Sequence, residues 1–322
     1  EKTPYAVVEG RALILDLDKA SEDHEYVRKL FEPDKPGRFA LRRSDGTTLY
    51  TSRDVAYSIY KVRDLGADLV YNVIAVEQVR EQKQVKATLY LAGYRDVADR
   101  IIHFSYEMVS LKGMKMGGRR GVYVTLDELM EDYADIIARK YFDNQLKLGV
   151  KEYEINTEEL LEAFRKLSVA CTRALLLSVE PSKVLVFDPS RIEDYDIGAW
   201  ILYTFVRLQS ILRKAYGFEP LDNVDELRRM LADLKHTLEN GKLEFSEEEK
   251  GIVEGILGFQ SNLLKAYREI DPSKILEYMR DLCMKLNKFY EKYPVLAERD
   301  EVKRALRLSL VIASTLVLRE LL

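Results

Sequence analysis

The sequence predicts a mixed architecture: an α/β domain built on a parallel sheet, followed by an all-α helical bundle. Residues 53–76 read as a helix and then an apolar strand, an order that leads the chain back parallel to an earlier strand. From about residue 140 onward the β-strand signal nearly disappears. Long amphipathic helices with short links follow instead, and this pattern is typical of a bundle.

The first elements are short and lie between turn signals. Residues 11–17 (RALILDL) predict a strand, and an acidic link containing proline follows as far as residue 37. The tripeptide at 44–46 (SDG) has turn chemistry, because its glycine adopts a positive φ without steric cost. The β-prone residues on either side, 38–42 and 47–51, therefore predict a hairpin.

A helix and a buried strand come next. Helical spacing of Val55, Ile59 and Val62 predicts a helix over 53–64. The nearly continuous apolar run at 69–76 predicts a strand covered on both faces. The expected later elements are a helix at 79–92, a strand at 101–111, a loop rich in Gly and Arg at 112–121, a strand at 122–125, a helix from 125 to 140 opened by a Thr125–Glu128 capping box, and a strand at 183–187.

The second half predicts six helices with apolar stripes. The last stripe, for example, contains Leu306, Leu310 and Val317. Three domains are expected: an α/β domain over 1–140, connecting helices over 141–196 and a bundle over 197–322. The six helices are expected at 157–177, 197–215, 223–240, 246–259, 273–293 and 299–322.

Composition excludes several classes of protein. A formal charge of −4 excludes a uniformly basic nucleic-acid binder, so any RNA contact must be a local patch. Two distant cysteines, Cys171 and Cys283, predict a reducing, cytoplasmic location and no disulfide framework. With only three scattered histidines, no metal site is expected. The apolar run at 308–318 is too short to span a bilayer, so no membrane partner is expected.

Three polar residues border the central helix and strand. Asp54 is expected in the first helical turn, four residues after Tyr50, and Gln78 follows the buried strand. A carboxylate in this position can bind a guanidinium, whose planar donors match its two oxygens. Spacing alone favours a structural interpretation, with Asp54 as a cap, Tyr50 as an aromatic at the end of a strand and Gln78 as a polar loop residue.

The loop KGMKMGGRR could bind phosphate. Its glycines permit a close backbone approach, while Lys115, Arg119 and Arg120 supply positive charge for a leaving pyrophosphate. Most basic, glycine-rich loops are merely solvated, so this motif alone is weak.

Together these segments resemble the arginyl-tRNA synthetases, a family of class I aminoacyl-tRNA synthetases. The resemblance rests on DGTTLYTSRDVAY with the following strand ending in EQ, and on HFSYEMVSLKGMKMGGRRGVYVTLDEL. It covers most of the chain and implies the second half of a Rossmann-type parallel sheet domain, followed by an anticodon-binding helical bundle named for a DALR motif. The bundle segments that carry it are 197–215 and 304–322. In the first of these, Trp200 and Leu202 depart from the usual pattern.

The resemblance implies ATP-dependent ligation of arginine to tRNA(Arg) through an arginyl-adenylate, with Mg²⁺ entering as the ATP complex. It places Tyr50, Asp54 and Gln78 on the substrate L-arginine. The loop is similar to the KMSK signature, although Gly117 stands where Ser is usual. It also implies catalytic roles for Lys115, Arg119 and Arg120, and ATP contacts by His103, Met114, Lys115 and Met116.

For the bundle we expect tRNA contacts from exposed basic and aromatic residues. These candidates are Tyr203, Arg207, Arg213 and Lys214. Core packing explains most of the apolar positions of these helices. We expect the protein to be a monomer.

Three interpretations remain open. The chain has no H-x-G-H signature, which class I synthetases use at the ATP phosphates, so we expect a fragment that is inactive by itself. The absence of an initial Met and the uncapped helix at Leu322 also predict a chain trimmed at both ends. A stand-alone, non-catalytic relative that binds RNA or protein is the alternative. An amino-acid sensor is the third.

Overall fold

The computed structural model describes residues 3–112, 123–148, 157–188, 191–192, 196–220 and 223–322. The chain folds into two compact units. The first contains residues 1–108 and 181–184, and the second contains 109–180 and 185–322. The expected loop at 112–121 lies almost wholly outside the described residues.

The first unit begins with an antiparallel sheet in the order β1 (Ala6–Glu9), β2 (Ala12–Asp16) and β3 (Arg38–Arg42). The expected strand at 11–17 is confirmed as β2. The link after it was predicted without structure, and this was wrong: it contains α1 (Leu17–Asp23) and α2 (Glu25–Phe31). Asp16 starts α1 by accepting a hydrogen bond from the Lys19 backbone N–H at 3.0 Å, a local signal that the acidic composition hid.

The predicted hairpin is reduced to a turn and one bridge. Gly46 has φ +89°, as its turn position requires, and Arg42 pairs with Thr48 in an isolated antiparallel bridge. No second strand forms, because the chain enters helix α3 (Tyr50–Arg63) directly. β3 instead pairs along its length with β2.

The second sheet of this unit is parallel, as predicted, but the expectation that the 69–76 strand pairs with an earlier strand is wrong. β4 (Val70–Ala75) pairs with β5 (Ile101–Tyr106) in the register Asn72–His103 and Val73–Phe104. Helices α3 and α4 (Val79–Leu91) pack against each other, and the short 3₁₀ segment η1 (Val76–Gln78) joins β4 to α4. Helix α5 (Arg95–Arg100), which sequence analysis missed, leads into β5.

The expectation that the 69–76 strand is covered on both faces is wrong for the described structure. Tyr71 is 39 % exposed and Val73 is 63 % exposed, whereas Val70 is buried. An uninterrupted apolar run does not state which side chains find a partner, and the described sheet has only two strands. One face of β4 therefore presents apolar side chains to solvent.

The strand expected at 101–111 is interrupted, because residues 101–106 form β5 of the first unit and only 109–111 form a strand in the second unit. Its last residues form β6 (Val109–Leu111), which pairs in parallel with β7 (Leu185–Phe187), the strand predicted at 183–187. Residues 123–125 are irregular, so no strand is seen in the described part of 122–125. The capping box is confirmed: the Glu128 N–H donates to Thr125 Oγ1 at 3.1 Å, and the Thr125 N–H donates to Glu128 Oε2 at 2.7 Å.

The predicted helices of the bundle are present, and a further helix, α11, was not among them. Residue Gly258 separates α10 from α11, where one helix was expected to reach Phe259. The helices of this unit are α6 (Leu126–Leu148), α7 (Thr157–Leu176), α8 (Ile197–Tyr216), α9 (Val224–Glu239), α10 (Glu247–Leu257), α11 (Phe259–Glu269), α12 (Ser273–Lys292) and α13 (Glu301–Leu321).

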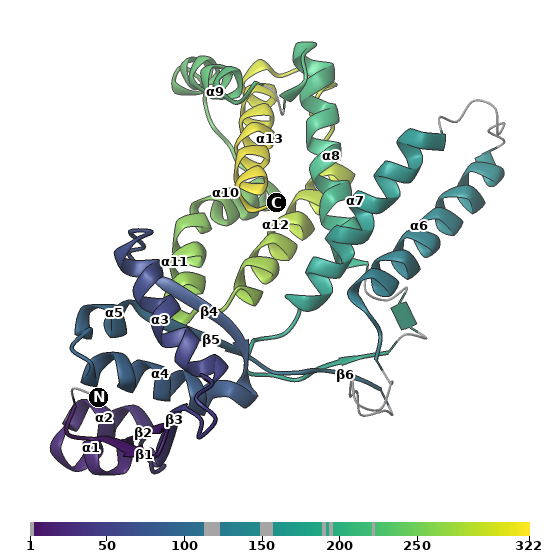
Figure 1. Cartoon of the computed structure of the whole chain (residues 1–322). Coiled ribbons are helices and arrows are strands. Elements are labelled where there is room, and N and C mark those ends of the chain that lie inside the picture. Colours follow the sequence, from purple (N-terminus) through teal and green to yellow (C-terminus); the bar gives the residue numbers. More distant parts are fainter. Residues whose placement is uncertain (1–2, 113–122, 149–156, 189–190, 193–195, 221–222) are drawn as a thin grey trace. The chain divides into compact units, whose positions relative to one another are not determined.

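The main core of this unit lies among α8, α9, α10, α12 and α13, and contains fully buried Leu208, Leu282 and Val311. Helices α6 and α7 run side by side, and α7 packs on α8 (Figure 1). Gly198 allows that second contact, because a Cβ at this position would overlap the Ala170 backbone of α7.

Candidate functional site

The three residues expected to bind arginine lie on two segments of the first unit. Tyr50 is the first residue of α3 and is 55 % exposed. Asp54 is one turn further along and half-buried, and Gln78 ends η1 directly after β4. The prediction that Asp54 lies in the first turn is wrong, because α3 begins earlier than expected and its first turn has no acidic residue.

No side-chain hydrogen bond joins Tyr50, Asp54 and Gln78 in the described structure. Tyr50 and Asp54 share one side of α3, since residues four apart are neighbours on a helix surface. Gln78 lies where β4 reaches its carboxyl end, the edge at which parallel sheets bind ligands. Their convergence on one ligand stays a prediction.

Asp54 carries a negative charge that is partly withdrawn from water. Burial raises the pKa of its carboxyl group, while the charge of Lys61 and the amide of Gln82 act in the opposite direction. Among the described residues, Asp54 forms no ion pair within 4.0 Å. A ligand that brings a cation would offset the burial penalty, so this carboxylate suits a guanidinium.

Beside Asp54 lies a chain of polar side chains that the sequence did not reveal. Lys61 Nζ donates to Asn72 Oδ1 at 2.9 Å, and Asn72 Nδ2 donates to Gln82 Oε1 at 2.9 Å. Gln82 is only 5 % exposed, and its Nε2 has no hydrogen-bond partner in the described structure. The available signal was a polar Asn inside an apolar strand, followed by a Gln on the buried face of the next helix.

His103, expected near ATP, lies within β5. A ring nitrogen, Nε2, is 2.9 Å from the Ile74 carbonyl oxygen on β4. Because a carbonyl oxygen can only accept, Nε2 carries the proton in this contact. The imidazole therefore links the two parallel strands. The other predicted nucleotide-site residues, Met114, Lys115, Met116, Arg119 and Arg120, lie outside the described residues.

The predicted RNA-contact residues of α8 separate into two groups. Tyr203, Arg207 and Lys214 fall on one stripe, since their spacings of four and seven residues match the helical repeat. Tyr203 is 62 % exposed, and the Arg207 guanidinium lies 5.1 Å from the centre of the Tyr290 ring. Lys214 is also exposed and has no side-chain partner in the described structure.

Arg213 lies off this stripe and is already engaged. Its Nε and Nη2 donate to the two carboxylate oxygens of Glu219 at 2.8 and 2.7 Å. This hydrogen-bonded pair raises the pKa of Arg213 and lowers the pKa of Glu219. An RNA phosphate would have to replace Glu219 before it could use this guanidinium.

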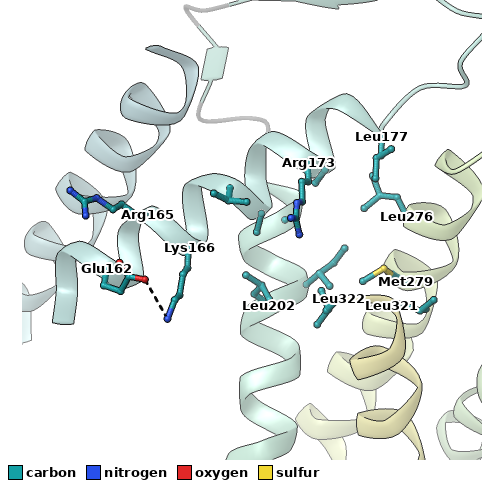
Figure 2. Close-up of a pocket in the computed structure, with 15 residues that line it drawn as sticks. Glu162, Arg165, Lys166, Arg173, Leu177, Leu202, Leu276, Met279, Leu321 and Leu322 are labelled. Atoms are coloured by element: carbon teal, nitrogen blue, oxygen red, sulfur yellow. Dashed lines mark ion pairs between the residues drawn. The ribbon is translucent and has the colours of Figure 1, made fainter. Parts of the chain in front are cut away.

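A pocket of about 640 Å³ opens among α7, α8, α12 and the end of α13 (Figure 2). Its wall is mostly apolar, with Leu202, Met279 and Leu322 among the lining residues. Cationic Arg165 and Arg173 also line it. None of the predicted site residues that the structure describes borders this pocket, and no sequence signal pointed to it.

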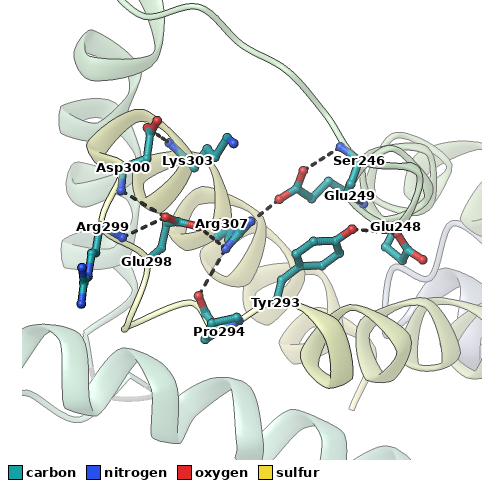
Figure 3. Close-up of polar contacts among 10 residues, drawn as sticks. All are labelled: Ser246, Glu248, Glu249, Tyr293, Pro294, Glu298, Arg299, Asp300, Lys303 and Arg307. Atoms are coloured by element: carbon teal, nitrogen blue, oxygen red, sulfur yellow. Dashed lines mark hydrogen bonds and ion pairs between the residues drawn. The ribbon is translucent and has the colours of Figure 1, made fainter.

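A second charged cluster lies inside the bundle (Figure 3). The Arg307 side chain is 7 % exposed and pairs with Glu249 at 3.0 Å and Glu298 at 2.6 Å. Its Nη1 also donates to the Pro294 carbonyl oxygen at 3.3 Å, and its guanidinium lies 4.9 Å from the centre of the Tyr293 ring. Every charge in this cluster has a partner, which indicates a structural role.

Neither a metal site nor a membrane span is found in the described parts of the chain. Nowhere in these ranges do three His, Cys, Asp or Glu residues group as they would to ligate a metal ion. The helices in the same ranges are too short or too polar to cross a bilayer. Both cysteines, Cys171 and Cys283, are buried, and burial raises the pKa of each thiol, that of Cys283 to about 12.

Comparison with known families matches nearly the whole chain. The model of the class I tRNA synthetase (R) catalytic domain matches residues 5–171, and the model of the DALR anticodon binding domain matches residues 201–322. The first match covers more than half of the chain. In the second, residues 304–307 read RALR, which shares three letters with the motif in the name of the domain.

Two archaeal relatives are similar over almost the full chain. The arginine–tRNA ligase of Korarchaeum cryptofilum is 36 % identical over 97 % of the chain, which covers 47 % of that relative. The ligase of Pyrobaculum arsenaticum is 34 % identical over 98 % of the chain, which covers 45 % of it. The chain thus spans about half the length of the curated relatives it matches.

Among solved structures, an arginyl-tRNA synthetase from Thermus thermophilus matches with a TM-score of 0.69 at 23 % identity, covering 98 % of the chain and 54 % of that protein. At this level of identity the match establishes the fold. The predicted combination of an α/β part with parallel pairing and a DALR-type helical part is therefore confirmed.

Proposed function

Because the chain belongs to the class I arginyl-tRNA synthetase family, we propose that it forms the part of an arginine–tRNA ligase that selects arginine and binds tRNA(Arg). In this proposal the ligase activates L-arginine with ATP, which arrives as its Mg²⁺ complex, and transfers the arginyl group to tRNA. Residues 1–140 supply the substrate subsites, 141–196 connect, and 197–322 supply the tRNA-binding bundle.

The half-buried, unpaired carboxylate of Asp54 carries this proposal. A protein seldom withdraws a charge from water without giving it a direct counter-ion, unless a ligand supplies one. Tyr50 lies one turn away on the same helix, with an exposed ring that can cover an alkyl chain. Gln78, at the end of β4, can bind the polar end of the substrate through its amide.

For ATP, the proposal assigns contacts to His103, Met114, Lys115 and Met116. Arg119 and Arg120 join Lys115 in stabilising the pyrophosphate as its charge develops. The link between His103 and the Ile74 carbonyl fixes the imidazole beside the carboxyl end of β4. The role of His103 is then to hold the nucleotide end of the sheet in place.

For tRNA, the proposal uses the α8 stripe of Tyr203, Arg207 and Lys214. An exposed phenol can stack on an unpaired base while the two cations pair with phosphates. Arg213 joins this surface only when its carboxylate partner Glu219 is displaced.

We also propose that the chain alone does not form arginyl-adenylate. It contains three histidines and no H-x-G-H segment, so the imidazoles that the family applies to the ATP phosphates are not supplied by its own residues. Pyrophosphate exchange with arginine, ATP and tRNA should therefore be silent for this chain, and measurable turnover would contradict this point.

The experiment for the arginine subsite is calorimetric titration of the full chain with L-arginine and with L-citrulline, whose side chain is neutral. Asp54→Asn should weaken arginine binding by about 2 kcal/mol, roughly 30-fold, because it removes a charge-assisted hydrogen bond. Binding of citrulline should change much less.

Asp64→Asn provides the matched control, since Asp64 is an exposed residue at the end of the same helix. It should leave both titrations unchanged. An arginine affinity equal in Asp54→Asn and in the parent chain would remove Asp54 from the site.

A non-catalytic module that binds RNA or protein is the second candidate. The link between His103 and the backbone favours it, because this imidazole already has a structural partner. Such a module needs no guanidinium site, so a chain that binds tRNA but shows no saturable arginine binding would support it.

A further inference from the structure

Three side chains of the first unit form a directed chain beside Asp54. Lys61 on α3 donates to Asn72 on β4, and Asn72 donates to Gln82 on α4, each at 2.9 Å. Gln82 is 5 % exposed, while Lys61 and Asn72 are half-buried. Three separate elements thus contribute to one polar path in the unit that contains Asp54.

The direction of this path follows from the chemistry of its first member. An ammonium can only donate, so Asn72 must present its oxygen to Lys61 and its NH₂ group to Gln82. Gln82 must then accept through Oε1, which leaves its buried Nε2 without a hydrogen-bond partner among the described residues. That N–H₂ group lies near enough to the Asp54 carboxylate to lower its pKa.

Lys61 is also the cation best placed to form an ion pair with the Asp54 carboxylate in place of the substrate. It is seven residues further along α3, two turns away on the same stripe, and its charge acts on Asp54. Two contacts hold its ammonium elsewhere: the hydrogen bond to Asn72, and the Tyr57 ring, whose centre is 4.4 Å from Nζ.

We propose that Asn72 and Gln82 are positioning residues of the arginine subsite: Asn72 keeps the Lys61 ammonium away from Asp54, and Gln82 orients the carboxylate toward the substrate guanidinium. The proposal rests on the proposed role of Asp54 in binding arginine. It adds a competition for the Asp54 carboxylate between the Lys61 ammonium and the substrate guanidinium. By holding Lys61, Asn72 leaves the carboxylate free for the substrate.

The competition predicts opposite effects for two substitutions. Without the Asn72 oxygen, Lys61 loses a partner and approaches Asp54, so Asn72→Ala lowers the pKa of Asp54. Without the ammonium, the charge that favours the carboxylate disappears, so Lys61→Gln raises this pKa. In the double variant both the amide and the ammonium are absent, so removing Asn72 has no further effect and the pKa of Asp54 should follow that of Lys61→Gln.

The measurement is the titration of the Asp54 carboxyl carbon by NMR in the full chain, without ligand. Lys86→Gln is the matched control, because Lys86 is another half-buried lysine of the same unit, bonded to the Ile101 carbonyl oxygen, and it does not act on Asp54. An Asp54 pKa that rises or stays constant in Asn72→Ala would overturn the proposal. Should that variant not fold, a fall or no change in Lys61→Gln would overturn it equally.

Arginine titration of the same variants tests the consequence. Asn72→Ala should bind arginine roughly fivefold more weakly, the effect of a partly exposed ion pair, and removing Lys61 as well should restore binding. A purely structural role for Asn72 predicts no such rescue, so weak binding by the double variant would also overturn the proposal.

The two measurements distinguish this inference from the proposed function. If the pKa changes occur as expected but neither the parent chain nor any variant binds arginine, the polar path is real and the assignment of Asp54 to arginine is wrong. If arginine binds through Asp54 and the pKa values do not respond, the assignment stands and the positioning role is wrong.

Discussion

Arg307 and Asp54 are two charges that are withdrawn from water, one fully and one partly, and their surroundings differ. In the bundle, Arg307 is enclosed by Glu249, Glu298 and a backbone carbonyl, and all of its partners are within 3.3 Å (Figure 3). In the first unit, Asp54 has no direct ionic partner among the described residues, and burial dominates the shift of its pKa. The charge of Arg307 is fully compensated, whereas that of Asp54 has no direct counter-ion among the described residues.

The difference separates structural from functional charge by a physical criterion. A buried ion with complete partners links the segments that supply them, as Arg307 links α13 to the start of α10 and to the segment before α13. A carboxylate withdrawn from water without such partners retains binding capacity. The predictions below test this distinction, from the largest expected effect to the smallest.

Removing the centre of the compensated cluster should have the largest effect. Arg307→Met leaves Glu249 and Glu298 without their common cation, and we expect the free energy of unfolding to fall by about 3–5 kcal/mol. Denaturant unfolding of the chain measures this loss.

Two further variants sharpen that result. Adding Glu249→Gln should restore part of the stability, because it removes the stranded charge while its amide oxygen can still accept from the Ser246 N–H. Arg213→Met breaks an exposed pair that solvent screens, so it should lower stability far less than Arg307→Met does. Equal losses at Arg307 and Arg213 would refute the distinction.

The same distinction between paired and unpaired groups predicts how residues in and beside α8 contribute to tRNA binding. Tyr203→Ala should weaken binding of tRNA(Arg) by about 1–3 kcal/mol, through loss of a stacking surface. Glu219→Gln should tighten binding, because it releases the Arg213 guanidinium from its carboxylate. Fluorescence anisotropy at fixed salt measures both, and weaker binding by Glu219→Gln would show that Arg213 does not reach RNA.

The pH dependence of stability should have opposite signs at the two sites. The pKa of Glu298 is lowered from its usual 4.5, chiefly by the Asp300 backbone N–H and further by that of Arg299 and by Arg307, so its contribution is present above pH 4.5 and is lost as the pH falls through the folded-state pKa. The pKa of Asp54 is raised from 3.8, so the folded state takes up this proton first and gains stability as the pH falls.

Denaturant midpoints between pH 7 and pH 3 measure these slopes. Glu298→Gln should remove part of the stability that the parent chain loses as the pH falls. Asp54→Asn should remove a contribution by which the parent chain gains stability as the pH falls. If both substitutions changed the pH dependence of stability in the same direction relative to the parent chain, the comparison would be contradicted.

The smallest effect is expected for the stability of Asp54→Asn at neutral pH. Because the ionised carboxylate carries a burial penalty, replacing it by a neutral amide should change the free energy of unfolding by no more than about 0.5 kcal/mol. A loss of several kcal/mol would mean that Asp54 is a structural charge like Arg307.

Much of the fold was predictable because local patterns encode it. The Thr125–Glu128 capping box, the strand β4 and the apolar stripe of α13 all follow from residues close together in the chain. The partner of β4 did not follow, because the predicted order pointed to an earlier strand, whereas β4 pairs with the later β5. The exposure of Val73 did not follow, since an apolar run specifies a strand but not its neighbours. Helices α1 and α2 were hidden in a short acidic segment whose helical repeat is too brief to detect.

The candidate site was predictable only in its residue types. Asp54 and Gln78 could be chosen from their positions beside an expected strand. For Asn72 and Gln82 the sequence offered only a polar residue within an apolar strand and a Gln in the next helix, which does not show that the two side chains meet. Arg307 ends the RALR segment, but nothing in that segment showed that its side chain is among the most buried charges described.

Periodicity along the chain was enough to establish most of the long helices and which of their faces are apolar, since this depends on neighbours three or four residues apart. The partners of each charge were decided only in three dimensions. Glu249 is 58 residues from Arg307, and Asn72 and Lys61 meet across a helix and a strand. Tertiary structure alone determines how far burial and a counter-charge offset each other at such a site.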